Sequence, residues 1–113
     1  MALMRIDEAA VVLHLHIRLK PGCRPAFLDY VREAFPVFES GCDCKGAVYA
    51  LADDPDALDE VFYYRTERDL QQGERLTEHD PVQAALLSRW RKLLDGPPRI
   101  EVRRRLEVDK TPS

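Results

Sequence analysis

The sequence predicts a small α+β protein whose elements follow the order strand, helix, strand, strand, helix, strand. Two observations carry this prediction. The spacing of apolar residues changes from two to about 3.6 and back, twice along the chain. Clusters of proline, glycine and aspartate separate these periodic segments, for example at Pro21-Gly22 and at Asp95-Gly96.

The first half of the chain predicts a strand followed by a helix. The strand is expected over 9–20, where apolar and polar residues alternate. The helix is expected over 24–38, with a proline in its first turn and an apolar stripe on one side. Pro36 has no N–H to donate, so we expect the regular helix to end or kink near Ala34 or Phe35.

The second half begins with a hairpin and continues with a broken helix. Strands are expected over 44–51 and 58–65, joined by an acidic turn at 53–56. Asp69 is expected to cap a short helical piece that runs towards Leu76. Because aspartate is a good N-cap and proline suits the first turn, Asp80-Pro81 restarts the helix, which continues to Leu94.

A last strand is expected over 100–108, which completes a ferredoxin-like fold. Two right-handed crossovers then place both helical segments on one face of a four-stranded antiparallel sheet. The other face would carry polar side chains such as His14, His16 and Arg103. Since the helices cannot reach this face, it is either solvated or covered by a second sheet in a dimer.

Composition narrows the class of protein. The chain has 113 residues, 45% hydrophobic and 33% charged, which predicts one globular domain over 1–113, with a core at 9–108 and flexible ends at 1–8 and 109–113. The net charge of −3 includes no long run of one sign, so we expect no nucleic-acid partner. Three cysteines and no apolar leader or membrane-length stretch predict a cytoplasmic protein without a membrane partner.

Short motifs stand at three junctions between the expected elements. They are Lys20-Pro21-Gly22 after the first strand, Glu39-Ser40-Gly41-Cys42 before the second, and Arg68-Asp69 after the third. In these motifs the chain resembles the antibiotic-biosynthesis-monooxygenase family of dimeric α/β barrels, over nearly its whole length from Val11 to Val108. It departs from the family pattern at Arg65, where an acidic residue is typical.

The resemblance implies a homodimer in which two sheets close a barrel, with a pocket between the helices and the sheet of each subunit. Many members oxidise phenols or quinols with O2 and need no metal or flavin. The resemblance therefore implies a cofactor-independent monooxygenase that acts on a small aromatic compound. Some relatives bind and degrade haem, which is the alternative cofactor.

His79 is the candidate catalytic base. It lies at the helix break, where loops often line pockets, and an imidazole titrates near neutral pH. The family places a histidine in this region, about three residues earlier. If His79 is the base, alanine in its place should lower turnover by about 10^2 to 10^4. The alternative is a surface or capping histidine.

Four further residues are candidates for binding an aromatic substrate. Tyr63, Tyr64 and Trp90 can stack on a flat ring, and Arg65 can bind an anion. The two tyrosines alternate on a strand, so only one of them can face the helices. Trp90 also lies in an apolar helical stripe, where its role would be core packing.

The sequence does not predict a metal site, although it has a pair of histidines and a pair of cysteines at a spacing of two. His14 and His16 share a strand face but lack an evident third ligand, and a structural zinc normally takes four ligands. Cys42 and Cys44 are expected to be a buried apolar pair, as free cysteines often are.

Two functions remain open from the sequence. One is the monooxygenase, and the other is a non-catalytic dimeric module that binds a small ligand or another protein. A largely apolar cavity of roughly 300 Å3 or more with His79 in its wall would favour an enzyme or ligand-binding protein. A filled core would favour an interaction module.

Overall fold

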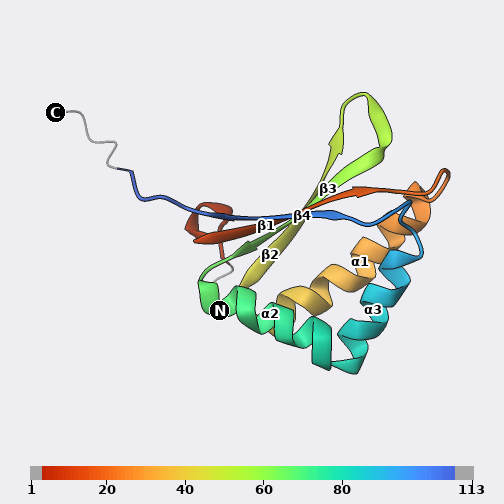
Figure 1. Cartoon of the computed structure of the whole chain (residues 1–113). Helices are drawn as coiled ribbons and strands as arrows, with labels where there is room; N and C mark the ends of the chain where they lie inside the picture. The colour runs from red at the N-terminus through yellow and green to blue at the C-terminus, as the bar shows by residue number, and fades with distance from the viewer. Residues whose placement is uncertain (1–3, 109–113) are drawn as a thin grey trace.

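The computed structural model describes residues 4–108 and has the predicted order of elements (Figure 1). The expected tail at 109–113 lies outside these residues. A short 3-10 turn, η1 (Ile6–Glu8), occupies part of the amino-terminal segment that was expected to be flexible. The strands and helices that follow are β1 (Val11–Arg18), α1 (Arg24–Gly41), β2 (Cys44–Leu51), β3 (Asp54–Tyr64), α2 (Glu67–His79), α3 (Pro81–Arg91) and β4 (Arg99–Arg104).

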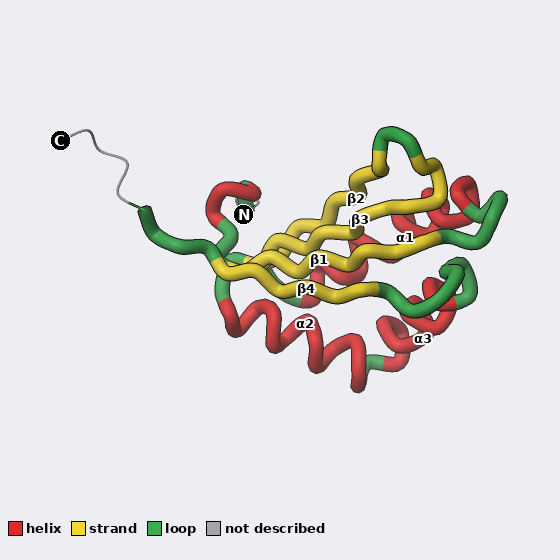
Figure 2. Tube along the Cα trace, turned by 45° about the horizontal axis from the view of Figure 1, so that its top comes forward, coloured by secondary structure: helices red, strands yellow, loops and turns green. Residues whose placement is uncertain are grey.

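The four strands form one antiparallel sheet in the order β2-β3-β1-β4. The helices α1, α2 and α3 lie on one side of this sheet, and within residues 4–108 no α-helix covers the other side (Figures 1 and 2). This arrangement confirms the ferredoxin-like prediction. Within residues 4–108 no helix is long and apolar enough to cross a membrane.

Of the two outcomes expected at Pro36, an end or a kink near Ala34 or Phe35, the structure excludes the end. The helix continues to Gly41 with Pro36 inside it. Proline removes one backbone hydrogen bond, but Phe35 and Phe38 on either side pack against the sheet and the Pro36 ring points to solvent. Packing of the aromatic side chains outweighs the lost hydrogen bond, because burying one such side chain is worth about 1.5–3 kcal/mol.

Other boundaries also shift from their predicted places. The N-cap of α2 is Thr66 instead of Asp69, which is the third helical residue and completes a capping box with Thr66. Asp80 does cap α3, as expected, by accepting a hydrogen bond from the backbone N–H of Gln83 at 3.0 Å. Strand β3 begins at Asp54, four residues before the predicted start at 58. Strand β4 ends at Arg104, before the predicted end at 108.

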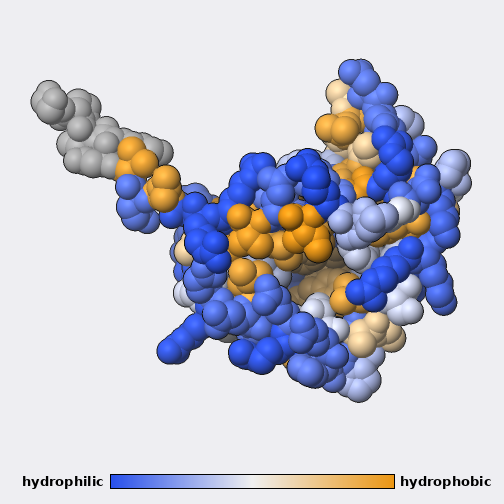
Figure 3. All heavy atoms as spheres, viewed as in Figure 1, coloured by the Kyte–Doolittle hydropathy of each residue, from blue (hydrophilic) through white to orange (hydrophobic). Residues whose placement is uncertain are grey.

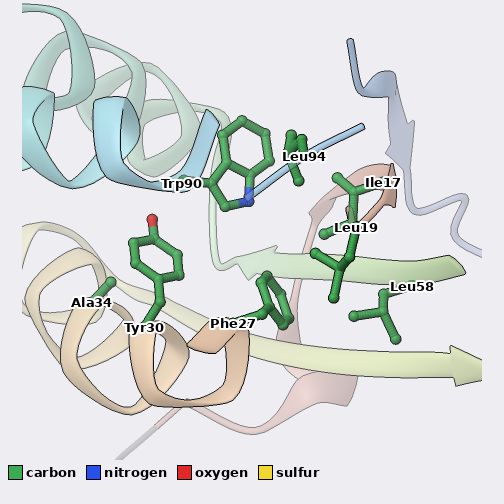
Figure 4. Packing of buried hydrophobic residues seen from close by; sticks show 8 residues of the cluster. All are labelled: Ile17, Leu19, Phe27, Tyr30, Ala34, Leu58, Trp90 and Leu94. Carbon is green, nitrogen blue, oxygen red and sulfur yellow. The ribbon is translucent and has the colours of Figure 1, made fainter. Parts of the chain in front are cut away.

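The core lies between the sheet and the helices. One of its two clusters joins β1 and β3 to α1 and α3, with Phe27 and Tyr30 fully buried (Figure 4). The other cluster lies nearer α2 and contains Phe35, Phe62 and Tyr64. The ring centroids of Phe35 and Phe62 are 4.9 Å apart, a distance typical of packed aromatic pairs.

The register of β3 decides which of its side chains face the helices. Tyr64 pairs with Val11 and Cys44 and is buried in the core, so Phe62 and Glu60 lie on that same face. Tyr63 therefore lies on the open face, where its hydroxyl is 3.1 Å from that of Tyr49.

Gly46 on β2 provides a test of this packing. A Cβ at this position would lie 2.6 Å from the Phe35 ring and 3.0 Å from the Phe62 ring. Gly46→Ala is therefore expected to lower the free energy of unfolding by about 1–3 kcal/mol, the usual cost of overpacking. Urea denaturation measures this change, and Lys45→Ala on the open face is the control, with little expected effect. Equal stability of Gly46→Ala and the unchanged chain would contradict the close approach of helix α1 to β2.

Candidate functional site

A cavity of about 220 Å3 lies between the sheet and the helices. The space-filling view shows the molecule hollowed there, with apolar side chains around much of the opening (Figure 3). The volume is smaller than the roughly 300–1,000 Å3 of typical drug-sized sites. Its apolar wall is formed mainly by Leu13, Leu15, Phe35, Phe38, Phe62 and Leu87.

Glu60 is an acidic side chain buried in this apolar wall. It is 2% exposed, in the middle of the central strand β3. Among the described residues its hydrogen-bond partner is Trp90, whose indole N–H donates to the carboxyl at 3.1 Å. Burial raises the pKa of Glu60 to about 8, and the hydrogen bond from Trp90 opposes that rise. The group is therefore mostly protonated at pH 7 and can gain or lose a proton near physiological pH.

The position of Trp90 follows from the way α3 begins. Asp80 and Pro81 start a new helix, whose last turn places Trp90 over the sheet. Trp90 from α3 and Tyr30 from α1 lie on facing helices (Figure 4). The tryptophan thus belongs both to the core, as predicted, and to the cavity wall.

Three further polar side chains in the cavity wall are more than nine-tenths buried: Tyr30, Tyr64 and Gln83. Within residues 4–108 neither tyrosine hydroxyl nor the side-chain amide of Gln83 forms a hydrogen bond, and these polar atoms are not fully enclosed by the protein. Burial raises the pKa of both tyrosines, so their hydroxyls stay protonated and can donate. Because these side chains line the cavity, their polar atoms can offer hydrogen bonds to a ligand there.

The structure places three of the candidate site residues outside this cavity. His79 does not line the cavity, because its side chain is 77% exposed and lies beside Glu78 at the end of α2. Tyr63 lies on the open face of the sheet. Arg65 is held outside the cavity by ion pairs to Asp43 at 2.5 Å and Glu8 at 3.1 Å. Of the predicted binding residues, Tyr64 and Trp90 are at the cavity.

The histidines of β1 lie on the open face. His16 is placed between two carboxylates, with Nδ1 2.5 Å from Asp59 and Nε2 2.8 Å from Glu101. The ring of His14 stacks beside it at 6.0 Å between centroids. In the part of the chain that the structure describes, no three His, Cys, Asp or Glu side chains form a group that could hold a metal ion.

Sequence reasoning missed Glu60 and Gln83. A signal for Glu60 was present, because it shares the period of two with Leu58, Phe62 and Tyr64. An acidic residue on the apolar face of a central strand is rarely buried without a functional or structural reason. Gln83 gave no such signal, since a polar residue in the first turn of a helix is usually solvated.

No family model matches this sequence, and no curated protein matches it either. Solved structures do match. A conserved protein from Methanosarcina mazei Go1 has a TM-score of 0.75 at 17% identity, covering 89% of this chain and 97% of that chain. A candidate antibiotic biosynthesis monooxygenase from Bordetella bronchiseptica has a TM-score of 0.66 at 21% identity, covering 88% and 99%.

A third solved structure that matches is described as a member of a different family. It is a nipsnap family protein with unknown function from Agrobacterium tumefaciens, with a TM-score of 0.71 at 14% identity, covering 97% of this chain and 98% of that chain. All three likenesses extend over nearly the whole of both chains. They confirm the predicted fold and support the resemblance to antibiotic biosynthesis monooxygenases at the level of the fold.

Proposed function

We propose that this protein is a small-molecule enzyme, a cofactor-independent monooxygenase in which Glu60 accepts a proton from a phenol- or quinol-like substrate. The observation that carries the proposal is a carboxyl group buried in the wall of an apolar cavity, with a single hydrogen bond from Trp90 among the described residues and with its pKa near 8. A general base works best when its pKa lies near the operating pH. Glu60 meets this condition and takes the role first assigned to His79.

The surroundings of Glu60 suit such a step. The apolar wall excludes water from a bound ring, which keeps a newly formed phenolate reactive. Tyr30 is close enough for the charge of Glu60 to affect its pKa, and its buried hydroxyl is free to hold a substrate oxygen. A phenolate is rich in electrons and can react with O2. When a ring C–H opposite the phenol oxygen becomes a carbonyl, one oxygen atom enters the quinone, the other leaves as water, and the substrate supplies all the electrons.

The volume of the cavity limits the substrate. A cavity of about 150 Å3 holds one benzene ring, so a volume of about 220 Å3 fits a substituted single ring or two small fused rings. We therefore expect one- and two-ring phenols and quinols to be turned over, and larger ring systems to be rejected.

The test is oxygen consumption by the purified protein with a series of one-, two- and three-ring phenols and quinols. A substrate should consume O2 at a rate proportional to protein concentration, and Glu60→Gln should remove that rate. Native mass spectrometry of the same samples reports binding separately. Ligand binding without oxygen consumption by any compound would favour the non-catalytic ligand-binding module instead.

We also propose that the protein is a homodimer joined through the open face of the sheet. The three helices cover one face, and the open face includes the half-buried apolar side chain of Val12 and the paired tyrosines Tyr49 and Tyr63. Sedimentation equilibrium at micromolar concentration should give roughly twice the chain mass, as expected for the two-fold symmetry that most oligomers adopt. A Tyr63→Arg variant should shift this mass towards the monomer. A monomeric unchanged chain would contradict the dimer but not the fold.

A further inference from the structure

Two thiols lie together in the cavity wall and have no part in the proton transfer proposed for Glu60. Cys42 directly follows α1 and Cys44 begins β2, and their sulfur atoms are 3.5 Å apart. Both side chains line the cavity. Neither cysteine is in a disulfide.

The residue between them explains why both thiols point inward. The carboxylate of Asp43 pairs with Arg65 at 2.5 Å, and its backbone N–H donates to Asp69 at 3.1 Å. These contacts hold Asp43 on the outside of the molecule. Because side chains alternate along extended backbone, Cys42 and Cys44 turn to the opposite side, towards the cavity.

The cavity around the thiols fits a flat ring that carries acceptor oxygens. Phe38 and Phe62 form an edge-to-face pair with centroids 5.9 Å apart, and both line the cavity. The hydroxyl of Tyr64 and the side-chain amide of Gln83 line the cavity, form no hydrogen bond with another described residue and can donate to a ligand. A quinone matches this set, because it is flat and apolar between two carbonyl oxygens that accept hydrogen bonds.

The environment of Cys42 and Cys44 also favours the formation of a disulfide between them. The hydrogen bond between the two thiols lowers the pKa of Cys42, while the same contact and burial raise the pKa of Cys44. A thiolate is the reactive form of cysteine, so Cys42 is the first sulfur to react. Cys42 lies in the turn between α1 and β2, where a movement of about 1.5 Å would bring the sulfurs to the bonded distance of about 2.05 Å.

We propose that Cys42 and Cys44 are a redox-active dithiol that reduces a quinone bound in the cavity. The two sulfurs lose one electron each and form the Cys42–Cys44 disulfide. The quinone gains these two electrons, and the two thiol protons end on its carbonyl oxygens, which gives the quinol. An external dithiol then returns the pair to its reduced form by thiol–disulfide exchange. This activity shares the cavity with the proposed monooxygenase but uses neither Glu60 nor O2.

The experiment is an anaerobic single turnover of the fully reduced protein with tetramethyl-1,4-benzoquinone. This quinone has no free ring carbon to which a thiol could add, so electron transfer is separated from adduct formation. Absorbance should show one quinol formed per chain. Free thiols should fall from the three present in the sequence to one, and the intact mass should fall by two hydrogens.

Cys23 supplies the matched control. It stands directly before the other end of α1, and a helix of this length spans about 27 Å, at 1.5 Å per residue. Cys23→Ala should therefore react like the unchanged chain. Cys42→Ala and Cys44→Ala should each form quinol at least about tenfold more slowly, since a lone thiol cannot close the disulfide. Urea denaturation of each variant checks that it is folded.

Several results would overturn the proposal. These are a thiol count that stays at three, an oxidised product linked between chains on a non-reducing gel, or a Cys42→Ala variant that reacts at the unchanged rate. Because no O2 is present, a failure of the monooxygenase proposal would leave this assay unaffected. Conversely, a negative result in the quinone assay would not change the pH dependence of kcat/KM that is expected for Glu60.

Discussion

Glu60→Gln is expected to lower kcat/KM for the phenolic substrate by about 10^2 to 10^4, the usual contribution of a general base. The amide can still accept the hydrogen bond from Trp90 but cannot take a proton from the substrate. The unchanged enzyme should also show a specific pH dependence. Its kcat/KM should rise about tenfold per pH unit below pH 8 and level off above it, because the base acts only when Glu60 is ionised.

The variant Glu60→Gln should keep only a low rate that does not follow this profile. His79→Ala is the matched control for the sequence-based alternative, and its rate should stay close to that of the unchanged enzyme because the side chain is solvent-exposed. A large loss in His79→Ala, together with full activity in Glu60→Gln, would restore histidine as the base and refute the role of Glu60.

The second large effect is on stability, and it depends on pH. The pKa of Glu60 is about 8 in the folded protein against 4.5 for an ordinary glutamate. Between these values the folded chain keeps a proton that the unfolded chain releases. This group therefore stabilises the fold below pH 4.5, and its contribution is lost at about 1.4 kcal/mol per pH unit as the pH rises towards 8.

Glu60→Gln has no carboxyl to ionise, so it should gain stability relative to the unchanged chain over the same range. The two proteins should differ little near pH 4.5, and the variant should be more stable by several kcal/mol above pH 8. Urea denaturation at intervals between pH 4.5 and 9 measures the difference. Glu107→Gln makes the same chemical change at an exposed position and should show no such trend. A constant difference between Glu60→Gln and the unchanged chain would mean that the carboxyl titrates normally.

The two experiments on Glu60 separate the burial of its carboxyl from the use of that carboxyl in a reaction. The stability experiment tests burial of the carboxyl and needs no substrate. The kinetic experiment tests whether that buried carboxyl is used in a reaction. A protein that shows the stability trend without any turnover would have the predicted electrostatics and the function of a binding module.

Local sequence patterns were enough to predict the fold of this protein. Period-two alternation in β1 and the apolar stripes of the helices report which residues can be buried, and this depends on local geometry alone. The break at Asp80-Pro81 was also predictable, because capping by aspartate and the first-turn preference of proline act within a few residues. The motif resemblance added the pocket between helices and sheet, which the cavity matches.

The position of the candidate site depends on contacts between residues that are far apart in the sequence. Whether Tyr63 or Tyr64 faces the helices depends on the pairing register of β3 with β1 and β2, which joins residues distant in sequence. The length of α1 depended on packing of Phe35 and Phe38 that compensates for Pro36. The raised pKa of Glu60 depends on the helices that cover it and on the absence of a nearby cation within residues 4–108. Burial and charge environment are sums over the whole fold, so no local pattern could distinguish Glu60 from an exposed strand residue or place His79 outside the cavity.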